Sequence, residues 1–86
     1  MAVYSLFFKD SVRKDLEPIP RNGLRRIIER IKSLAAEPRP LGCEKLSGQE
    51  KYRIRQGNYR IIYSIQDTQL TVWVVKVGHR REVSRT

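Results

Sequence analysis

The chain has little of the chemistry that most catalytic sites need, and each scarcity excludes a class of site. Cys43 is the single cysteine, which excludes an intrachain disulfide and a cysteine-based metal site. His79 is the single histidine, which excludes a mechanism with two histidines as acid and base. No hydrophobic run approaches a membrane span, and the apolar stretch over 2–8 is too short for a signal-peptide core. We therefore expect a cytoplasmic protein with no membrane contact, no metal and no cofactor.

Acidic residues are also scarce, and this imbalance is the strongest signal in the composition. The 86 residues include 18 Lys and Arg against 9 Asp and Glu, for a net charge of +9. So basic a chain favours a nucleic acid or an acidic protein as partner, because its field attracts polyanions. A merely basic soluble domain is the alternative. The length predicts a single domain over 1–86.

The hydrophobic pattern predicts an α+β fold. We expect an N-terminal strand, a two-helix hairpin and a three-stranded antiparallel meander, which form one sheet with the helices on one face. The expected ranges are a strand over 3–8, a first helix capped by Asp10 or Ser11 and ended by Pro18 and Pro20, a helix over 21–36, and strands over 51–55, 59–65 and 70–77. Leu41 and Leu46, in the loop between helices and meander, are expected to pack onto the core.

The clearest local prediction is a tight hairpin around Gly57-Asn58, a dipeptide that suits a two-residue loop. It places Ile54 opposite Ile61, Tyr52 opposite Tyr63, and Arg55 opposite Arg60. Arg53 then shares the arginine face. Like charges opposite one another destabilise a sheet by a few tenths to about 1 kcal/mol, so an anionic partner explains this cluster better than folding does.

A second hairpin near Asp67-Thr68 is predicted to pair Ile65 with Leu70 and Ile62 with Trp73. The face that carries the arginines then also carries an apolar patch of Ile62, Trp73, Val75 and Val77. Three interpretations are open: the C-terminal residues cover the patch, the helices bury part of it, or it binds a partner.

The arginines suggest chemistry on a phosphate. RNA cleavage by its own 2′-hydroxyl needs in-line positioning, charge stabilisation and two proton transfers. Arginines supply the first two through paired hydrogen bonds to phosphate oxygens, but a guanidinium is not a base. His79 is the one side chain suited to proton transfer near neutral pH, although a structural role is the alternative.

Four motifs in order carry a family resemblance: 46–48 (Leu-Ser-Gly), 52–55 (Tyr-Arg-Ile-Arg), 57–63 (Gly-Asn-Tyr-Arg-Ile-Ile-Tyr) and 77–83 (Val-Gly-His-Arg-Arg-Glu-Val). Together they resemble the RelE branch of the RelE/ParE toxin superfamily over nearly the whole chain. The resemblance implies the RelE-like microbial RNase fold and a toxin of a type II toxin–antitoxin pair. Members of this branch cleave mRNA in the ribosomal A site and are neutralised by a cognate antitoxin.

The resemblance also implies site residues. The family's basic catalytic set matches Arg53, Arg55, Arg60 and Arg80, with His79 as the candidate acid or base. Arg60 and Arg80 are expected to bind the scissile phosphate, and Arg53 and Arg55 to position the RNA backbone. The motif commonly ends in a tyrosine, whereas this chain has Ser84, which cannot stack on a base.

The implied partners are an acidic, amphipathic antitoxin segment, the ribosome with its mRNA, and operator DNA through the antitoxin complex only. The antitoxin is expected on the basic side and on the patch that includes Ile62, Trp73 and Val75. Two rival functions are open: a ParE-like inhibitor that binds DNA gyrase, and a catalytically attenuated relative that mainly binds antitoxin and operator DNA. The shared fold alone does not choose among them.

Overall fold

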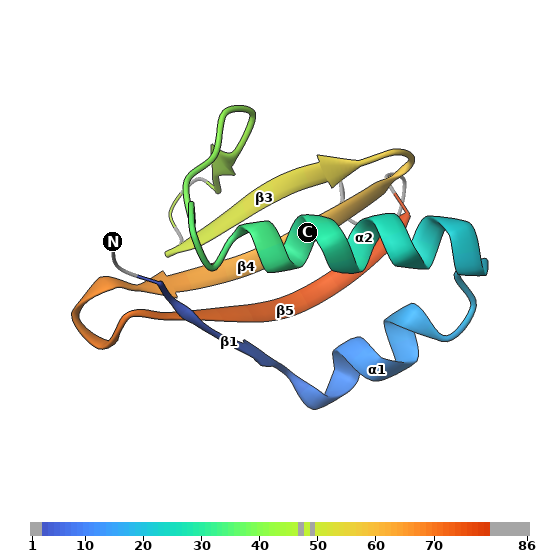
Figure 1. The fold of residues 1–86 in the computed structure, drawn as a ribbon, viewed down its shortest axis with the longest axis horizontal. Helices are drawn as coiled ribbons and strands as arrows, with labels where there is room; N and C mark the ends of the chain where they lie inside the picture. Colours follow the sequence, from blue (N-terminus) through green and yellow to red (C-terminus); the bar gives the residue numbers. More distant parts are fainter. Residues whose placement is uncertain (1–2, 47, 49, 80–86) are drawn as a thin grey trace.

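The computed structural model describes residues 3–46, 48 and 50–79, which form two helices and a five-stranded mixed sheet (Figure 1). The strands are β1 (Ser5–Phe8), β2 (Glu44–Lys45), β3 (Lys51–Gln56), β4 (Tyr59–Gln66) and β5 (Thr71–His79), in the spatial order β1-β5-β4-β3-β2. The helices are α1 (Asp10–Leu16) and α2 (Arg21–Ser33), and a short 3₁₀ turn, η1 (Asp67–Gln69), joins β4 to β5. The predicted α+β class and order of elements are confirmed.

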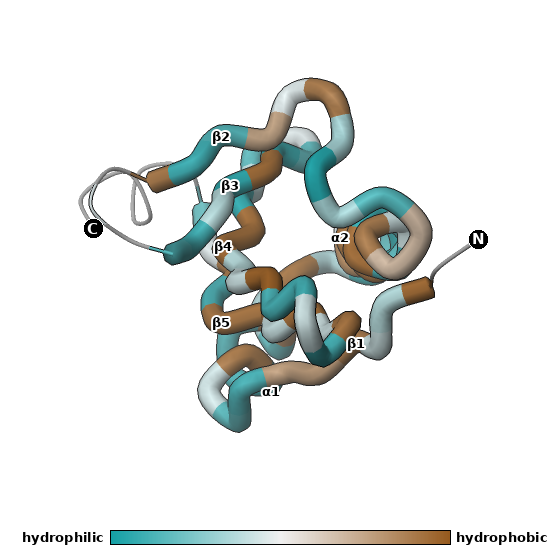
Figure 2. Tube along the Cα trace, turned by 90° about the vertical axis from the view of Figure 1, so that its left-hand side faces the viewer, coloured by the Kyte–Doolittle hydropathy of each residue, from teal (hydrophilic) through white to brown (hydrophobic). Residues whose placement is uncertain are grey.

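The helix α2 lies across one face of the sheet, which we call the inner face; the opposite face is the outer face (Figures 1 and 2). Hydrophobic residues recur along α2 with the spacing of one helical stripe, and Ile27, Ile31 and Leu34 from this stripe are fully buried. They pack in one core with alternate residues of β3, β4 and β5. The core residues of the strands are Ile54, Ile61, Tyr63, Val72, Val74 and Val77.

The hairpin of β3 and β4 has the predicted register. Ile54 pairs with Ile61, Tyr52 with Tyr63, and Arg55 with Arg60. Gly57 takes the positive φ (60°) that the two-residue loop requires, a conformation that costs glycine little. Because side chains alternate between the faces of a strand, this register sends the isoleucines into the core and the arginines to the outer face.

The register predicted for β4 and β5 is wrong by two residues near the turn and by three residues at Ile62. Ile65 pairs with Val72 rather than Leu70, because η1 and Leu70, which has φ 50°, lengthen the connection. Further along, Tyr63 pairs with Val74 and Ile62 with Lys76, which leaves Val75 as a bulge. A bulge reverses the alternation beyond it, so Val77 lies in the core and not on the outer face.

The helix α1 lies along the edge of the sheet, beside the part of β5 that β1 does not reach. β1 runs parallel to β5 and pairs only with Thr71–Val74. Beyond that point the backbone N–H of Lys9 donates to the carbonyl oxygen of Val74 at 2.9 Å, and Asp15 Oδ2 accepts from the N–H of Val77 at 3.1 Å. A short edge strand followed by a helix protects the second half of β5 from pairing with another chain.

Distant segments meet at Asp67, which the sequence did not suggest. Both Asp67 carboxylate oxygens accept from Arg39, at 3.2 and 2.9 Å, and Tyr4 donates to Oδ1 at 2.7 Å. Arg39 also donates from Nε to the Tyr52 hydroxyl at 3.2 Å. The Arg39 hydrogen bonds lower the pKa of Asp67, so their stabilisation is present above the ordinary carboxyl pKa and is lost as pH falls through the lowered value.

Three smaller predictions are corrected. Neither Asp10 nor Ser11 caps α1, because the helix begins after Lys9 and no side chain bonds its first turn. The helix α2 ends at Ser33, three residues earlier than expected, in a turn before Pro38. Leu41 is almost fully exposed, since the backbone turns outward toward the unpredicted strand β2. Among the described residues, no helix is long and apolar enough to cross a membrane.

We predict that Tyr63→Phe destabilises the fold. Tyr63 is fully buried, and its hydroxyl donates to the Pro38 carbonyl oxygen at 2.8 Å. Loss of this donor leaves a buried acceptor unpaired, so the free energy of unfolding in urea should fall by about 1–3 kcal/mol. Tyr52→Phe is the control: it removes the same group from a half-buried ring and should cost less. Equal losses in the two variants contradict a buried, structural role for the Tyr63 hydroxyl.

Candidate functional site

The outer face next to the Gly57 turn holds the candidate site. Arg55 and Arg60 lie directly opposite one another, and Arg53, two residues before Arg55 on β3, lies on the same face. We call Arg53, Arg55 and Arg60 the arginine cluster. A niche of about 30 Å³ lies beside Arg55 and Arg60, enough for one or two waters. The site is therefore an open, charged surface that suits an extended polyanion.

The three arginines differ in their surroundings. Arg55 is exposed, whereas Arg60 is 8% exposed and lies within the sheet surface opposite Gly78. Arg53 is mostly covered and forms an ion pair from Nη2 to Glu44 Oε2 at 3.3 Å. Glu44 comes from β2, directly across from Arg53. Sequence reasoning missed Glu44, because a strand of two residues gives no periodic signal.

His79 is the last residue of β5, and it lies on the inner face, opposite the arginine cluster. It pairs with Tyr59, and its ring contacts the Tyr59 ring edge-on, with the centroids 5.9 Å apart. Tyr59 packs against the core on the inner face. His79 is thus separated from the arginine cluster by strand alternation, although its neighbour Gly78 pairs with Arg60.

Two predicted features lie outside the described residues: Arg80 in the basic set, and Ser84 at the family's tyrosine position. Within the described part of the chain, no group of three or more His, Cys, Asp or Glu residues is placed to hold a metal ion.

The predicted apolar patch is only partly present. Ile62 is buried and Val75 is half-buried, so neither offers much surface. Trp73 is 37% exposed and stacks on Phe7 of β1, with ring centroids 5.0 Å apart and an angle of 23° between the rings. The exposed part of the patch is therefore an aromatic pair at the β1–β5 edge, which the sequence pattern did not indicate.

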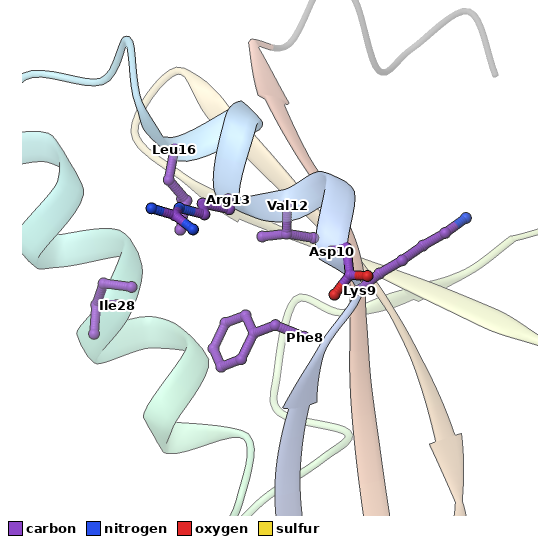
Figure 3. A pocket seen from close by; sticks show the side chains of 7 residues that line it. All are labelled: Phe8, Lys9, Asp10, Val12, Arg13, Leu16 and Ile28. Atoms are coloured by element: carbon purple, nitrogen blue, oxygen red, sulfur yellow. The ribbon is translucent and has the colours of Figure 1, made fainter.

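A larger hollow lies between β1, α1 and α2 and is lined by none of the three residues of the arginine cluster (Figure 3). It measures about 510 Å³, and Phe8, Val12, Leu16 and Ile28 supply most of its lining. Lys9, Asp10 and Arg13 add charge around these apolar groups. Mainly apolar walls suit an apolar ligand or side chain rather than a phosphate. The candidate site for a polyanion is accordingly the outer face.

The comparisons with known proteins now decide the family. A family model described as the ParE toxin of the type II toxin–antitoxin system parDE matches residues 6–84. The chain belongs to the RelE/ParE superfamily of type II toxins. Toxin RelG of Mycobacterium tuberculosis is 31% identical over 86 residues, which covers 95% of this toxin and 97% of RelG.

Solved structures agree in fold with this toxin. The toxin–antitoxin complex RelBE2 of M. tuberculosis contains a chain with a TM-score of 0.83 and 30% identity, covering 93% of this toxin and 94% of that chain. The archaeal RelE–RelB complex of Pyrococcus horikoshii gives a TM-score of 0.82 and 31% identity, covering 91% and 96%. The family model takes its name from ParE, and these relatives take theirs from the Rel group.

We predict that Arg55→Ala leaves the toxin as stable as wild type or slightly more stable. Arg55 is exposed and faces another arginine, so its removal relieves repulsion and deletes little packing. The free energy of unfolding in urea should change by less than about 0.5 kcal/mol or rise by up to about 1 kcal/mol. The contrast is Arg53→Ala, which breaks the ion pair with Glu44 and should destabilise. A clear loss of stability in Arg55→Ala contradicts the assignment.

Proposed function

We propose that this toxin is a metal-independent, ribosome-dependent endonuclease that cleaves mRNA in the A site and so arrests translation, and that residues 1–86 form one toxin domain. The supporting observation is the pairing of Arg55 with Arg60 on an open face beside Arg53. Such a pairing opposes folding, yet it offers two guanidinium groups to one phosphodiester.

The reaction needs no group beyond RNA, arginine and a proton carrier. The 2′-oxygen attacks the adjacent phosphorus, the bond to the 5′-oxygen breaks, and a cyclic phosphate and a 5′-hydroxyl result. A base removes the proton of the 2′-hydroxyl, and an acid protonates the leaving oxygen. In between, the phosphorane carries extra negative charge, which fixed guanidinium groups stabilise more strongly than they stabilise the substrate.

The residue roles follow from this chemistry. Arg60 and Arg80 bind the scissile phosphate and its transition state, and Arg53 and Arg55 hold the neighbouring backbone. The burial of Arg60 supports its role, because a guanidinium held within the sheet surface is already positioned for the phosphate. His79 is the candidate acid or base because it is the only histidine in the sequence and follows Gly78, the partner of Arg60. Its ring lies on the opposite face from the arginine cluster, so this role requires the RNA to reach around the end of β5.

An antitoxin is the proposed protein partner. Solved relatives are named as complexes with RelB, and an acidic segment suits a chain with a net charge of +9. Operator DNA is reached only through that complex. The free toxin is proposed to act in the cytoplasm, where ribosomes and mRNA are found.

Inhibition of DNA gyrase is the second candidate, because the matching family model is described as ParE. Purified toxin should be added both to translating ribosomes, with the mRNA ends mapped, and to a gyrase supercoiling reaction. We expect new mRNA ends at A-site codons and normal supercoiling. Blocked supercoiling with intact mRNA favours the ParE-like function, and no effect in either assay favours an attenuated relative that mainly binds antitoxin.

We predict that His79→Gln slows cleavage with little change in ribosome affinity. The arginines still hold the mRNA in this variant, so only the proton transfer is lost. General acid–base catalysis typically contributes 10²–10⁴-fold, and the single-turnover rate at saturating ribosomes should fall by about that factor.

Arg55→Gln is the contrast, because loss of a phosphate contact should raise the toxin concentration needed and make the affinity less dependent on salt, with the slope of log affinity against log salt smaller by about 1. Cleavage by His79→Gln at the wild-type rate removes His79 from the mechanism. In that case the proton carrier is ribosomal RNA or water.

A further inference from the structure

An exposed aromatic pair remains unexplained by the proposed cleavage site. Phe7 is 43% exposed and Trp73 is 37% exposed, and their rings are stacked on the outer face of the sheet. The pair comes from neighbouring strands, β1 and β5, in direct register. Large aromatic rings left exposed in so small a fold are costly unless a partner covers them.

The neighbours of this pair leave room for a flat ligand. Trp73 pairs with Ser64 on β4, and Ser64 pairs with Lys51 on β3. Phe7, Trp73, Ser64 and Lys51 therefore form one row across the outer face, which we call the aromatic row. Ser64 is small, so the bulk of the next side chain does not fill the space beside the indole. Lys51 is exposed and adds a positive charge at the far end of the row.

The aromatic row and the arginine cluster lie on one continuous face. Along β4, Ser64 is four residues from Arg60, a distance of about 13 Å at about 3.3 Å per residue. About 13 Å is also the length of roughly four stacked nucleotides at 3.4 Å each. Between the aromatic row and the Arg55–Arg60 pair lies the row that pairs Lys76 with Ile62 and Ile62 with Arg53. Lys76 adds a cationic side chain to those of the arginine cluster.

We propose that Phe7 and Trp73 form a base-stacking subsite for single-stranded RNA, with Lys51 as a phosphate contact, a few nucleotides from the arginine cluster. Sheet faces that bind single strands combine aromatic platforms with basic side chains in this way. The subsite deepens the proposed function, since it would hold the mRNA on one side of the cleaved bond.

The charge of the face favours RNA over a protein as the occupant. Lys51, Arg53, Arg55, Arg60 and Lys76 all lie on the outer face, against Glu44 as the acidic residue on the strands described there. The apolar part is limited to the two rings, because Ile62 is buried. A few flat rings within a basic surface match alternating bases and phosphates better than they match the apolar side of a helix.

Trp73 is the only tryptophan in the sequence, so fluorescence excited selectively at tryptophan, and not at the four tyrosines, reports on this subsite alone. The probe is a short oligoadenylate with 2′-O-methyl groups, which lack the nucleophile and cannot be cleaved. We expect saturable quenching of Trp73 when this oligonucleotide binds the isolated toxin. An abasic strand with the same phosphates should bind more weakly and leave the fluorescence unchanged.

Phe7 and Phe8 give a matched pair of variants. They are adjacent, of one residue type and almost equally exposed, at 43% and 42%, but they lie on opposite faces of β1. Phe7→Leu should weaken RNA binding in fluorescence anisotropy, and Phe8→Leu should not. Trp73→Leu should weaken binding by about 5- to 150-fold, the measured range for one base stacked on an aromatic ring.

The binding assay contains no ribosomes, so it does not depend on whether the toxin cleaves mRNA. RNA binding that leaves Trp73 unquenched, with equal affinities for Phe7→Leu and Phe8→Leu, overturns the subsite. Absence of RNA binding by the wild-type toxin overturns it as well. Quenching by an acidic antitoxin peptide but not by RNA assigns the aromatic row to a protein partner instead. If the subsite is present and mRNA stays intact on ribosomes, only the proposed cleavage fails.

Discussion

The register of the β3–β4 hairpin is the constraint on which the core and the candidate site both depend. The two-residue loop at Gly57 and Asn58 sets Ile54 against Ile61 and, one position further, Arg55 against Arg60. A slip of one residue would exchange the two faces, expose the isoleucines and bury the arginines. Burial of each large apolar side chain contributes about 1.5–3 kcal/mol, whereas the arginine pair costs at most about 1 kcal/mol. The core therefore holds the like charges together.

The proposed binding of an RNA phosphate depends on this difference between core burial and arginine repulsion. Because the apolar core holds Arg55 opposite Arg60 in the free toxin, the proposed binding of an RNA phosphate would require less ordering of these side chains. Glu44 forms an ion pair with Arg53, the member of the cluster furthest from the turn, and Arg55 is exposed. The antitoxin proposed as partner would act on the same charge, because an acidic segment suits the exposed Arg55.

Sequence patterns predict the parts of this structure that depend on local chemistry. Alternation and the Gly57 turn were sufficient for the β3–β4 register, and the apolar stripe was sufficient for the start and buried face of α2 but not for its end. The β4–β5 register was not predictable in the same way, because the left-handed conformation of Leu70 and the bulge at Val75 leave no periodic signal. For the site, the pattern identified the arginines but missed Glu44 and Phe7, since both depend on pairing between strands distant in sequence.

The salt dependence of stability tests the central claim, that the core holds Arg55 and Arg60 together against their repulsion. Unfolding in urea should be followed from about 0.05 M to about 1 M NaCl, over which the Debye length falls to about 3 Å. The control is Arg25→Ala, which also removes one positive charge but from an ion pair with Glu29 on α2. The free energy of unfolding should rise with salt in wild type and in Arg25→Ala, and clearly less in Arg55→Ala. Equal salt dependence in all three proteins would contradict the account.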